Sequence, residues 1–183
     1  MVIFSMVMLA TGILGVHRIP SFLDRGLSAQ LVSFATAFDA VCAGASAFTM
    51  GFLVRKVPSR FLGGVGFVLL AVASVLTIYA NNLPVMFLSM AVFGLGIGGM
   101  MFLQNFMWAE YFGRQHLGGI RGIATPVMLV VGGIGGPLAG YVYDAPGSYT
   151  SVWWAGVCLM LAGAAVLIFT AAPRRLPTRP PAT

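Results

Sequence analysis

The chain has 183 residues, of which 59% are hydrophobic and only 8% are charged. Soluble domains carry about 25% charged residues, so this composition excludes a water-soluble globule and indicates a membrane protein. The net charge of +6 does not indicate a nucleic-acid partner, because the basic residues lie at the ends of apolar runs and form no extended solvated patch.

Six apolar segments predict membrane helices, each of which needs about 20 mainly apolar residues. They are residues 1–16, 29–54, 61–80, 83–108, 120–143 and 151–171. Helices are required because lipid-exposed backbone must satisfy its own hydrogen bonds. The sequence therefore predicts an all-α membrane protein with one six-helix transmembrane domain, 1–172, and a Pro/Arg-rich tail, 173–183.

The first segment is shorter than the others. Sixteen residues span about 24 Å at 1.5 Å per residue, less than a hydrocarbon core of about 30 Å, so we expect that its beginning is missing. Residues 17–28 are expected to form a loop, with Ser28 capping the second helix. Tight turns are expected at Asn81-Asn82 before Pro84 and at 144–148. Cys42 and Cys158 lie inside apolar segments, as small hydrophobes.

Basic residues lie mainly on one side of the predicted bundle. Eight of the ten follow the second, fourth and sixth segments: Arg55, Lys56, Arg60, Arg114, Arg121, Arg174, Arg175 and Arg179. Because cytoplasmic loops are enriched in Lys and Arg, this predicts a cytoplasmic C-terminus, and we expect an integral protein of a bacterial inner membrane. On the other side, His17, Arg18 and Arg25 are expected near the external mouth, with His17 and Arg18 at the surface.

Asp39 is the ionisable side chain deepest in a predicted helix, about 16 Å along it from Ser28. A central Asp facing lipid costs roughly 2.5–3.5 kcal/mol, so Asp39 should face protein or a water-filled cavity. A low dielectric favours the neutral carboxyl, which suits a proton carrier; the alternative is a hydrogen-bonded Asp that fixes helix packing. Thr36 lies three residues earlier and shares its face. The other polar candidates for a substrate or proton pathway are Thr11, Ser33, Ser89, Gln104, Asn105 and Thr125.

Glycines recur at four-residue spacing in two predicted helices, which is typical of close helix packing in membranes. They are Gly94 and Gly98 in the fourth helix and Gly132, Gly136 and Gly140 in the fifth. The run around Gly94 does not fit a dinucleotide-binding fingerprint, since no strand precedes it. Pro137 removes a backbone hydrogen bond and should kink the fifth helix, either as a gating hinge or as a feature of shape.

Four stretches carry a resemblance to a known family. They are HRIPSFLDRGLS from His17, GFLVRKVPSR from Gly51, AEYFGRQHLGGIRG from Ala109 and GGIGGPLAG from Gly132. In this order, and with six helices, they resemble the C-terminal half of a major facilitator superfamily (MFS) transporter, and the monocarboxylate and oxalate/formate-type branch looks closest. The second stretch is similar to the cytoplasmic loop motif G-x-L-x-D-R-x-G-R-R, with Arg55 at the acidic position and Pro58 at the second glycine.

The resemblance implies twelve helices in two six-helix halves with the substrate between them. This chain would supply one half, as a fragment that lacks its N-terminal half or in a pair with another six-helix chain. It would transport a small organic anion such as a monocarboxylate by alternating access, with proton coupling through Asp39. That branch often carries an arginine in the eighth helix for the substrate carboxylate, which residues 29–54 lack.

The resemblance also assigns a cytoplasmic gate. Glu110 is similar to an acidic residue that pairs with the preceding basic loop, here through Arg55 or Arg60, while Lys56 helps to hold this loop inside. A local ion pair with Arg114, four residues on, is the alternative.

The sequence predicts no enzyme, cofactor or metal site, since it contains no Ser-His-Asp, Cys-His or metal-ligand constellation. The rival interpretation from another class is a non-transporting membrane scaffold or assembly partner.

Overall fold

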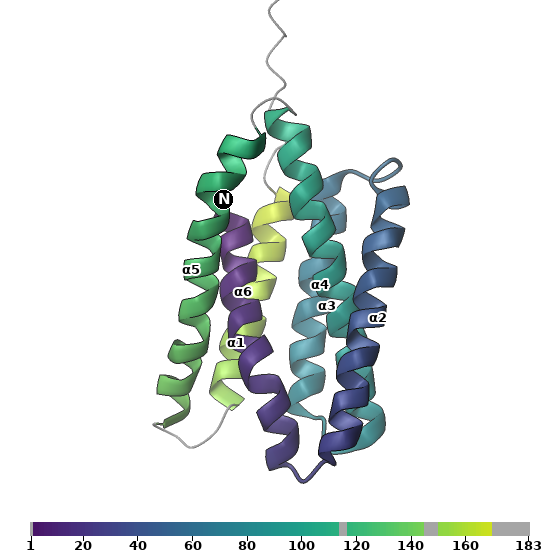
Figure 1. Ribbon diagram of the computed structural model, residues 1–183, viewed down its shortest axis with the longest axis vertical. Helices are drawn as coiled ribbons and strands as arrows, with labels where there is room; N and C mark the ends of the chain where they lie inside the picture. Colours follow the sequence, from purple (N-terminus) through teal and green to yellow (C-terminus); the bar gives the residue numbers. More distant parts are fainter. Residues whose placement is uncertain (1, 114–116, 145–149, 170–183) are drawn as a thin grey trace, which may run out of the picture.

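The computed structural model describes residues 2–113, 117–144 and 150–169, which form six helices connected as neighbouring up and down segments (Figure 1). The helices are α1 (Val2–Asp24), α2 (Ala29–Leu53), α3 (Ser59–Ile78), α4 (Leu83–Phe112), α5 (Leu117–Asp144) and α6 (Thr150–Phe169). Five are long and apolar enough to cross a membrane, and α6 contains a shorter apolar stretch, Trp153–Phe169. The all-α membrane class predicted from the sequence is confirmed.

Helix α1 corrects the prediction for the N-terminal part of the chain. It continues through Pro20 to Asp24, whereas the sequence predicted a helix over 1–16 and a loop over 17–28. A proline is tolerated in a membrane helix when neighbouring helices compensate for the freed backbone group. The apolar span Ser5–Asp24 has 20 residues, so the inference of a first helix too short to cross is wrong.

The other helix ends follow their local sequence closely. Asn82 accepts a hydrogen bond from the Val85 backbone N–H at 3.0 Å and so caps α4, as its turn signal predicts. Ser28 occupies the cap position of α2, but its side chain makes no capping hydrogen bond there. Pro58 immediately precedes α3. The turn expected at 144–148 falls almost wholly outside the described residues.

The helices pack in the order α5, α1, α6, α3, α4, α2, which Figure 1 shows from left to right with α3 behind α4. Helix α5 packs mainly on α1, and α2 packs mainly on α4. Helix α3 packs about equally on α4 and α6, and α6 packs less closely on α1, so the α3–α6 contact joins the α5–α1–α6 group to the α3–α4–α2 group. Helices α1 and α2 make few contacts with each other although they follow one another in the chain. We call the boundary between α1 and α2 the α1–α2 seam.

The core lies where α3 packs against α4 and α6. Its largest fully buried members include Phe67, Leu70, Met100 and Met160. Helices α2 and α5 instead expose many large apolar side chains, among them Phe34, Phe38, Phe48 and Phe52 on α2 and Ile123, Leu129, Val130 and Ile134 on α5. Such surfaces suit lipid or another apolar helix and would be unfavourable in water.

Candidate functional site

An ion pair crosses the α1–α2 seam. Arg18 of α1 donates from Nη2 to Oδ2 of Asp39 in α2 at 2.6 Å. The side chains are only 5% and 15% exposed, so the pair is shielded from water on most sides. At such burial each charge depends on the other, because an unpaired ion in a low dielectric is strongly disfavoured.

Helix α4 supplies the remaining contacts of the pair. Nη2 of Arg18 also lies 2.7 Å from the Met90 sulfur, and the guanidinium carbon stands 3.9 Å from the centre of the Phe93 ring. A ring face at this distance attracts a cation through its quadrupole. At Gly94, an added Cβ would lie 2.6 Å from Asp39 Oδ1. The glycine therefore makes the space that the carboxylate occupies.

The pair keeps unused hydrogen-bonding capacity. Arg18 Nη1 and Asp39 Oδ1 are buried and have no hydrogen-bond partner among the described residues. A guanidinium can grip a carboxylate with two parallel N–H groups, but here one nitrogen makes the contact with Asp39. Arg18 therefore retains donors for a second anionic group.

The burial of Arg18 corrects the prediction that it lies at the surface of an external mouth. Its position in α1 continues a buried stripe at four-residue spacing, formed by Ala10, Leu14, Arg18 and Phe22. This periodicity was readable in the sequence, but Pro20 and the neighbouring charges favoured a loop. Residues 29–54 contain no arginine, and the arginine beside Asp39 comes from the preceding helix.

His17 is turned toward the other neighbour of α1. Its Nε2 lies 3.0 Å from the Gly136 carbonyl oxygen in α5, one residue before Pro137. The partly exposed His17 therefore joins α1 to α5, while Arg18 joins α1 to α2.

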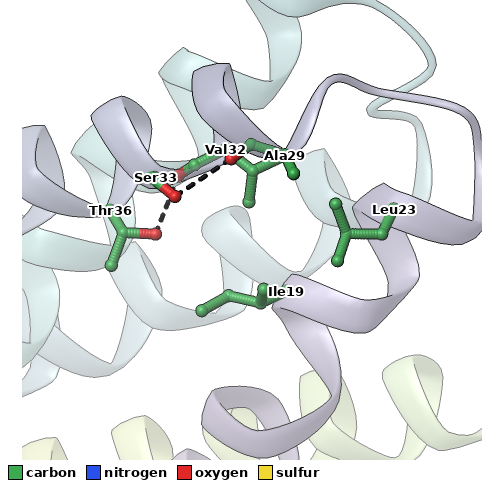
Figure 2. Close-up of a pocket in the computed structure, with 6 residues that line it drawn as sticks. All are labelled: Ile19, Leu23, Ala29, Val32, Ser33 and Thr36. Atoms are coloured by element: carbon green, nitrogen blue, oxygen red, sulfur yellow. Dashed lines mark hydrogen bonds between the residues drawn. The ribbon is translucent and has the colours of Figure 1, made fainter.

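A groove of about 300 Å³ lies in the seam between α1 and α2. Figure 2 shows Ile19 and Leu23 on its α1 side. The α2 side presents Ala29, Val32, Ser33 and Thr36. Thr36, predicted as part of a substrate or proton pathway, therefore lies at this groove and three residues from Asp39.

The other predicted pathway residues lie elsewhere. Thr11 donates to the Val7 carbonyl of its own helix at 2.8 Å, and Asn105 donates to Met101 in α4 at 2.9 Å. Gln104 Nε2 contacts the Met128 sulfur of α5 at 3.3 Å. Among the described residues, none of these three makes a hydrogen bond to Arg18 or Asp39.

The predicted cytoplasmic gate lies at the opposite end of α2. Arg55 and Lys56 are exposed and follow the end of α2, and Arg60 stacks on the Phe61 ring at 4.8 Å. Glu110 accepts a hydrogen bond from the Ser59 hydroxyl at 3.3 Å, which brings it to the start of α3. Arg114 lies outside the described residues, and the pairing of Glu110 with Arg55 or Arg60 stays a prediction.

The predicted packing glycines lie in two helix crossings. In α4, a Cβ on Gly94 or Gly98 would collide with the backbone of Asp39 or Ala43 in α2. In α5, a Cβ on Gly132 would lie 3.2 Å from the Met8 carbonyl oxygen of α1. Gly12 of α1, which the sequence interpretation missed, approaches the same Gly132. A Cβ added to Gly140 would have no atom of the described residues within 4 Å, and one added to Gly136 would lie nearest to the Val16 side chain. Pro137 is exposed within α5.

Arg25, which the sequence interpretation placed near the external mouth, contacts the end of α3. Its Nη1 donates to the carbonyl oxygens of Thr77, Ile78 and Ala80 at 2.6, 3.2 and 3.3 Å, where α3 ends and its carbonyls lack helical partners. Nη2 donates to Ser21 at 3.2 Å. Burial lowers the pKa of the Arg25 guanidinium, which still stays protonated at physiological pH.

The sequence as a whole matches the family model described as Major Facilitator Superfamily over residues 1–183. The chain belongs to this superfamily. No curated protein matches it. MFS proteins are membrane transporters of small solutes, and the apolar helices place this MFS chain in the bilayer. In the described part of the chain no group of three or more His, Cys, Asp or Glu side chains is placed to hold a metal ion.

Proposed function

We propose that this chain transports a small organic anion, such as a monocarboxylate, with a coupled proton. The observation that carries the proposal is the buried Arg18–Asp39 pair. A guanidinium is always charged and matches a carboxylate geometrically, and Arg18 Nη1 has no partner among the described residues. When Asp39 takes up a proton, Arg18 loses its counter-ion and can bind the carboxylate of a substrate instead.

This exchange keeps the buried charge balanced. With Asp39 ionised, the site contains one cation and one anion; with Asp39 protonated and the substrate bound, it again contains one of each. The costly states are those with only one of the two charges. Proton uptake and anion binding therefore favour one another, which is the coupling that a symporter needs.

We propose further that the chain acts as the C-terminal six-helix half of a twelve-helix transporter. Substrate sites of such proteins lie near the midplane where the halves meet. The apolar surfaces of α2 and α5 supply faces for the second six-helix unit as well as for lipid. The excess of basic residues after α2 and α4 supports a cytoplasmic C-terminus, in a bacterial inner membrane.

The cytoplasmic gate fits the same scheme. Glu110 and Ser59 bring the end of α4 to the start of α3, next to the basic residue Arg60. We propose that Glu110 pairs with Arg60 or Arg55 when the cytoplasmic side is closed and separates from it when that side opens.

The test is uptake of radiolabelled short carboxylates into membrane vesicles that contain the assembled transporter, with and without an imposed pH gradient. Asp39→Asn should abolish the stimulation by the gradient, and Arg18→Lys should weaken carboxylate affinity because an ammonium cannot form the planar fork. The matched control is Asp24→Asn, which removes an exposed carboxylate at the end of α1. Gradient stimulation that survives in Asp39→Asn, or uptake of neutral solutes alone, would refute the proposal.

A further inference from the structure

The groove in the α1–α2 seam has one lining residue, Thr36, a single helical turn from Asp39. Thr36, which lines the groove together with Ser33, lies three residues before Asp39, and residues three apart are neighbours on the helix surface. On the α1 side, the lining residue Ile19 directly follows Arg18. The sparse contact between α1 and α2 is the reason that this groove is not filled by side chains.

The two side-chain hydroxyls of the groove are available as hydrogen-bond acceptors and not as donors. Ser33 donates its hydroxyl hydrogen to the Ala29 carbonyl at 3.0 Å, and Thr36 donates to Val32 at 2.9 Å. Each hydroxyl thus spends its single donor within its own helix (Figure 2) and keeps acceptor capacity. The groove consequently offers acceptors to a group that carries hydrogens, such as water or hydronium, and no side-chain donor to an anion.

The size of the groove suits several water molecules. Its volume of about 300 Å³ compares with about 30 Å³ for one water in the liquid. Its remaining lining residues are apolar, so the two hydroxyls are the polar side-chain groups to which waters in the groove would bind. The Asp39 side chain, 15% exposed, does not itself line the groove but lies one helical turn beyond its lining residue Thr36.

We propose that this groove is a water-filled port through which protons reach and leave Asp39. In the forward step, hydronium in the groove transfers one proton to the Asp39 carboxylate and remains as water; the reverse step returns it. The charged group that faces Asp39 from α1 is Arg18; from α4, Gly94 lies against Asp39, and Met90 and Phe93 contact Arg18, none of which titrates. The role of Asp39 rests on the proposed function, whereas the water in the groove does not.

Thiol labelling tests the port, because a cysteine reacts as its thiolate, which forms in water and not in lipid. In a chain with Cys42→Ala and Cys158→Ala, Ser33→Cys should react with a membrane-impermeant, positively charged methanethiosulfonate reagent at least about tenfold faster than Phe34→Cys. Phe34 is the adjacent residue, is 59% exposed and does not line the groove. Ala29→Cys, also in the groove, gives a second position if Ser33→Cys does not reach the membrane.

The outcomes separate the port from the proposed function. If the cysteines at positions 33 and 34 react at equal rates, or if those at 29 and 33 both fail to react, the groove is filled with lipid. Either result refutes the proposed water-filled port. Fast labelling of position 33 together with unchanged proton coupling in Asp39→Asn supports water in the groove but refutes Asp39 as the carrier. Fast labelling with lost coupling supports both.

Discussion

Removing either member of the Arg18–Asp39 pair should destabilise the protein far more than removing both. Arg18→Met leaves a carboxylate in a site that is largely shielded from water, and Asp39→Leu leaves a guanidinium there, with side-chain exposures of 15% and 5% in the parent. Breaking a buried ion pair by removing one partner costs about 3–5 kcal/mol, whereas replacing both by apolar residues is near neutral. The double variant should therefore lie within about 1 kcal/mol of the parent.

The local contacts make the two single losses unequal. In Asp39→Leu, the guanidinium keeps the Phe93 ring at 3.9 Å and the Met90 sulfur at 2.7 Å, and a cation–ring contact is worth about 0.5–2 kcal/mol. In Arg18→Met, the carboxylate loses its hydrogen bond to Arg18, and Oδ1 already lacks a partner. Near neutral pH, Asp39→Leu should thus lie at the lower end of the range and Arg18→Met at the upper end.

The stability of Arg18→Met should depend on pH, whereas that of Asp39→Leu should not. In Arg18→Met, the remaining carboxyl can become neutral by binding a proton, so the folded form binds more protons than the unfolded form and gains stability as pH falls. In Asp39→Leu, the guanidinium cannot lose its proton, so the loss of stability relative to the parent should stay constant over the same pH range.

Thermal unfolding of the purified protein in detergent measures these differences. For a chain of this size, 1 kcal/mol corresponds to about 2–4 °C in Tm, so each single variant should melt about 6–20 °C below the parent near neutral pH. The reasoning is refuted if the two losses add in the double variant, because additive losses would mean that the charges do not interact. It is also refuted if Arg18→Met and Asp39→Leu respond equally to pH.

Three further predictions concern residues outside the ion pair. Arg25→Ala removes the side-chain donor to carbonyls at the end of α3 and should lower the free energy of unfolding by about 1–3 kcal/mol. The measurements are Tm, which should fall, and amide exchange at the end of α3, which should become faster. Gly98→Ala should cost about 1–3 kcal/mol through overpacking against α2, whereas Gly133→Ala, with nothing within 4 Å, should be neutral or stabilising; equal effects would contradict the close crossing. Gly26→Ala places a side chain at φ +78° and should lower stability by about 1 kcal/mol, and an unchanged Tm would contradict this.

The sequence predicted the helices where apolar runs were unbroken. For α2 the predicted range 29–54 and the observed Ala29–Leu53 nearly coincide, because the run ends at a basic cluster and Pro58. For α1 the prediction stopped eight residues early, since His17, Arg18 and Pro20 resemble loop residues when local sequence alone is considered. Their helical state depends on partners in α2, α4 and α5, which lie far away in the chain.

The site shows the same division between local and tertiary information. Asp39 was identified because an acidic residue inside an apolar helix is costly wherever the helix packs. Its partner was missed because pairing depends on the angle between α1 and α2 and on the space that Gly94 leaves in α4. The four-residue stripe through Leu14, Arg18 and Phe22 was the one local signal that Arg18 faces inward.

The position of the pair argues against a purely structural role. Two apolar residues in place of Arg18 and Asp39 would hold the helices together about equally well, so stability alone does not account for a buried charge there. The pair lies in the seam where α1 and α2 otherwise contact little, whereas the continuous contact between the two helix groups runs through α3 and α6. A polar contact that one proton can break is therefore placed where the least apolar packing opposes separation. Under the proposed function, the protonation state of Asp39 would therefore bias the spacing of α1 and α2, with the α3–α6 contact as the part that stays in place.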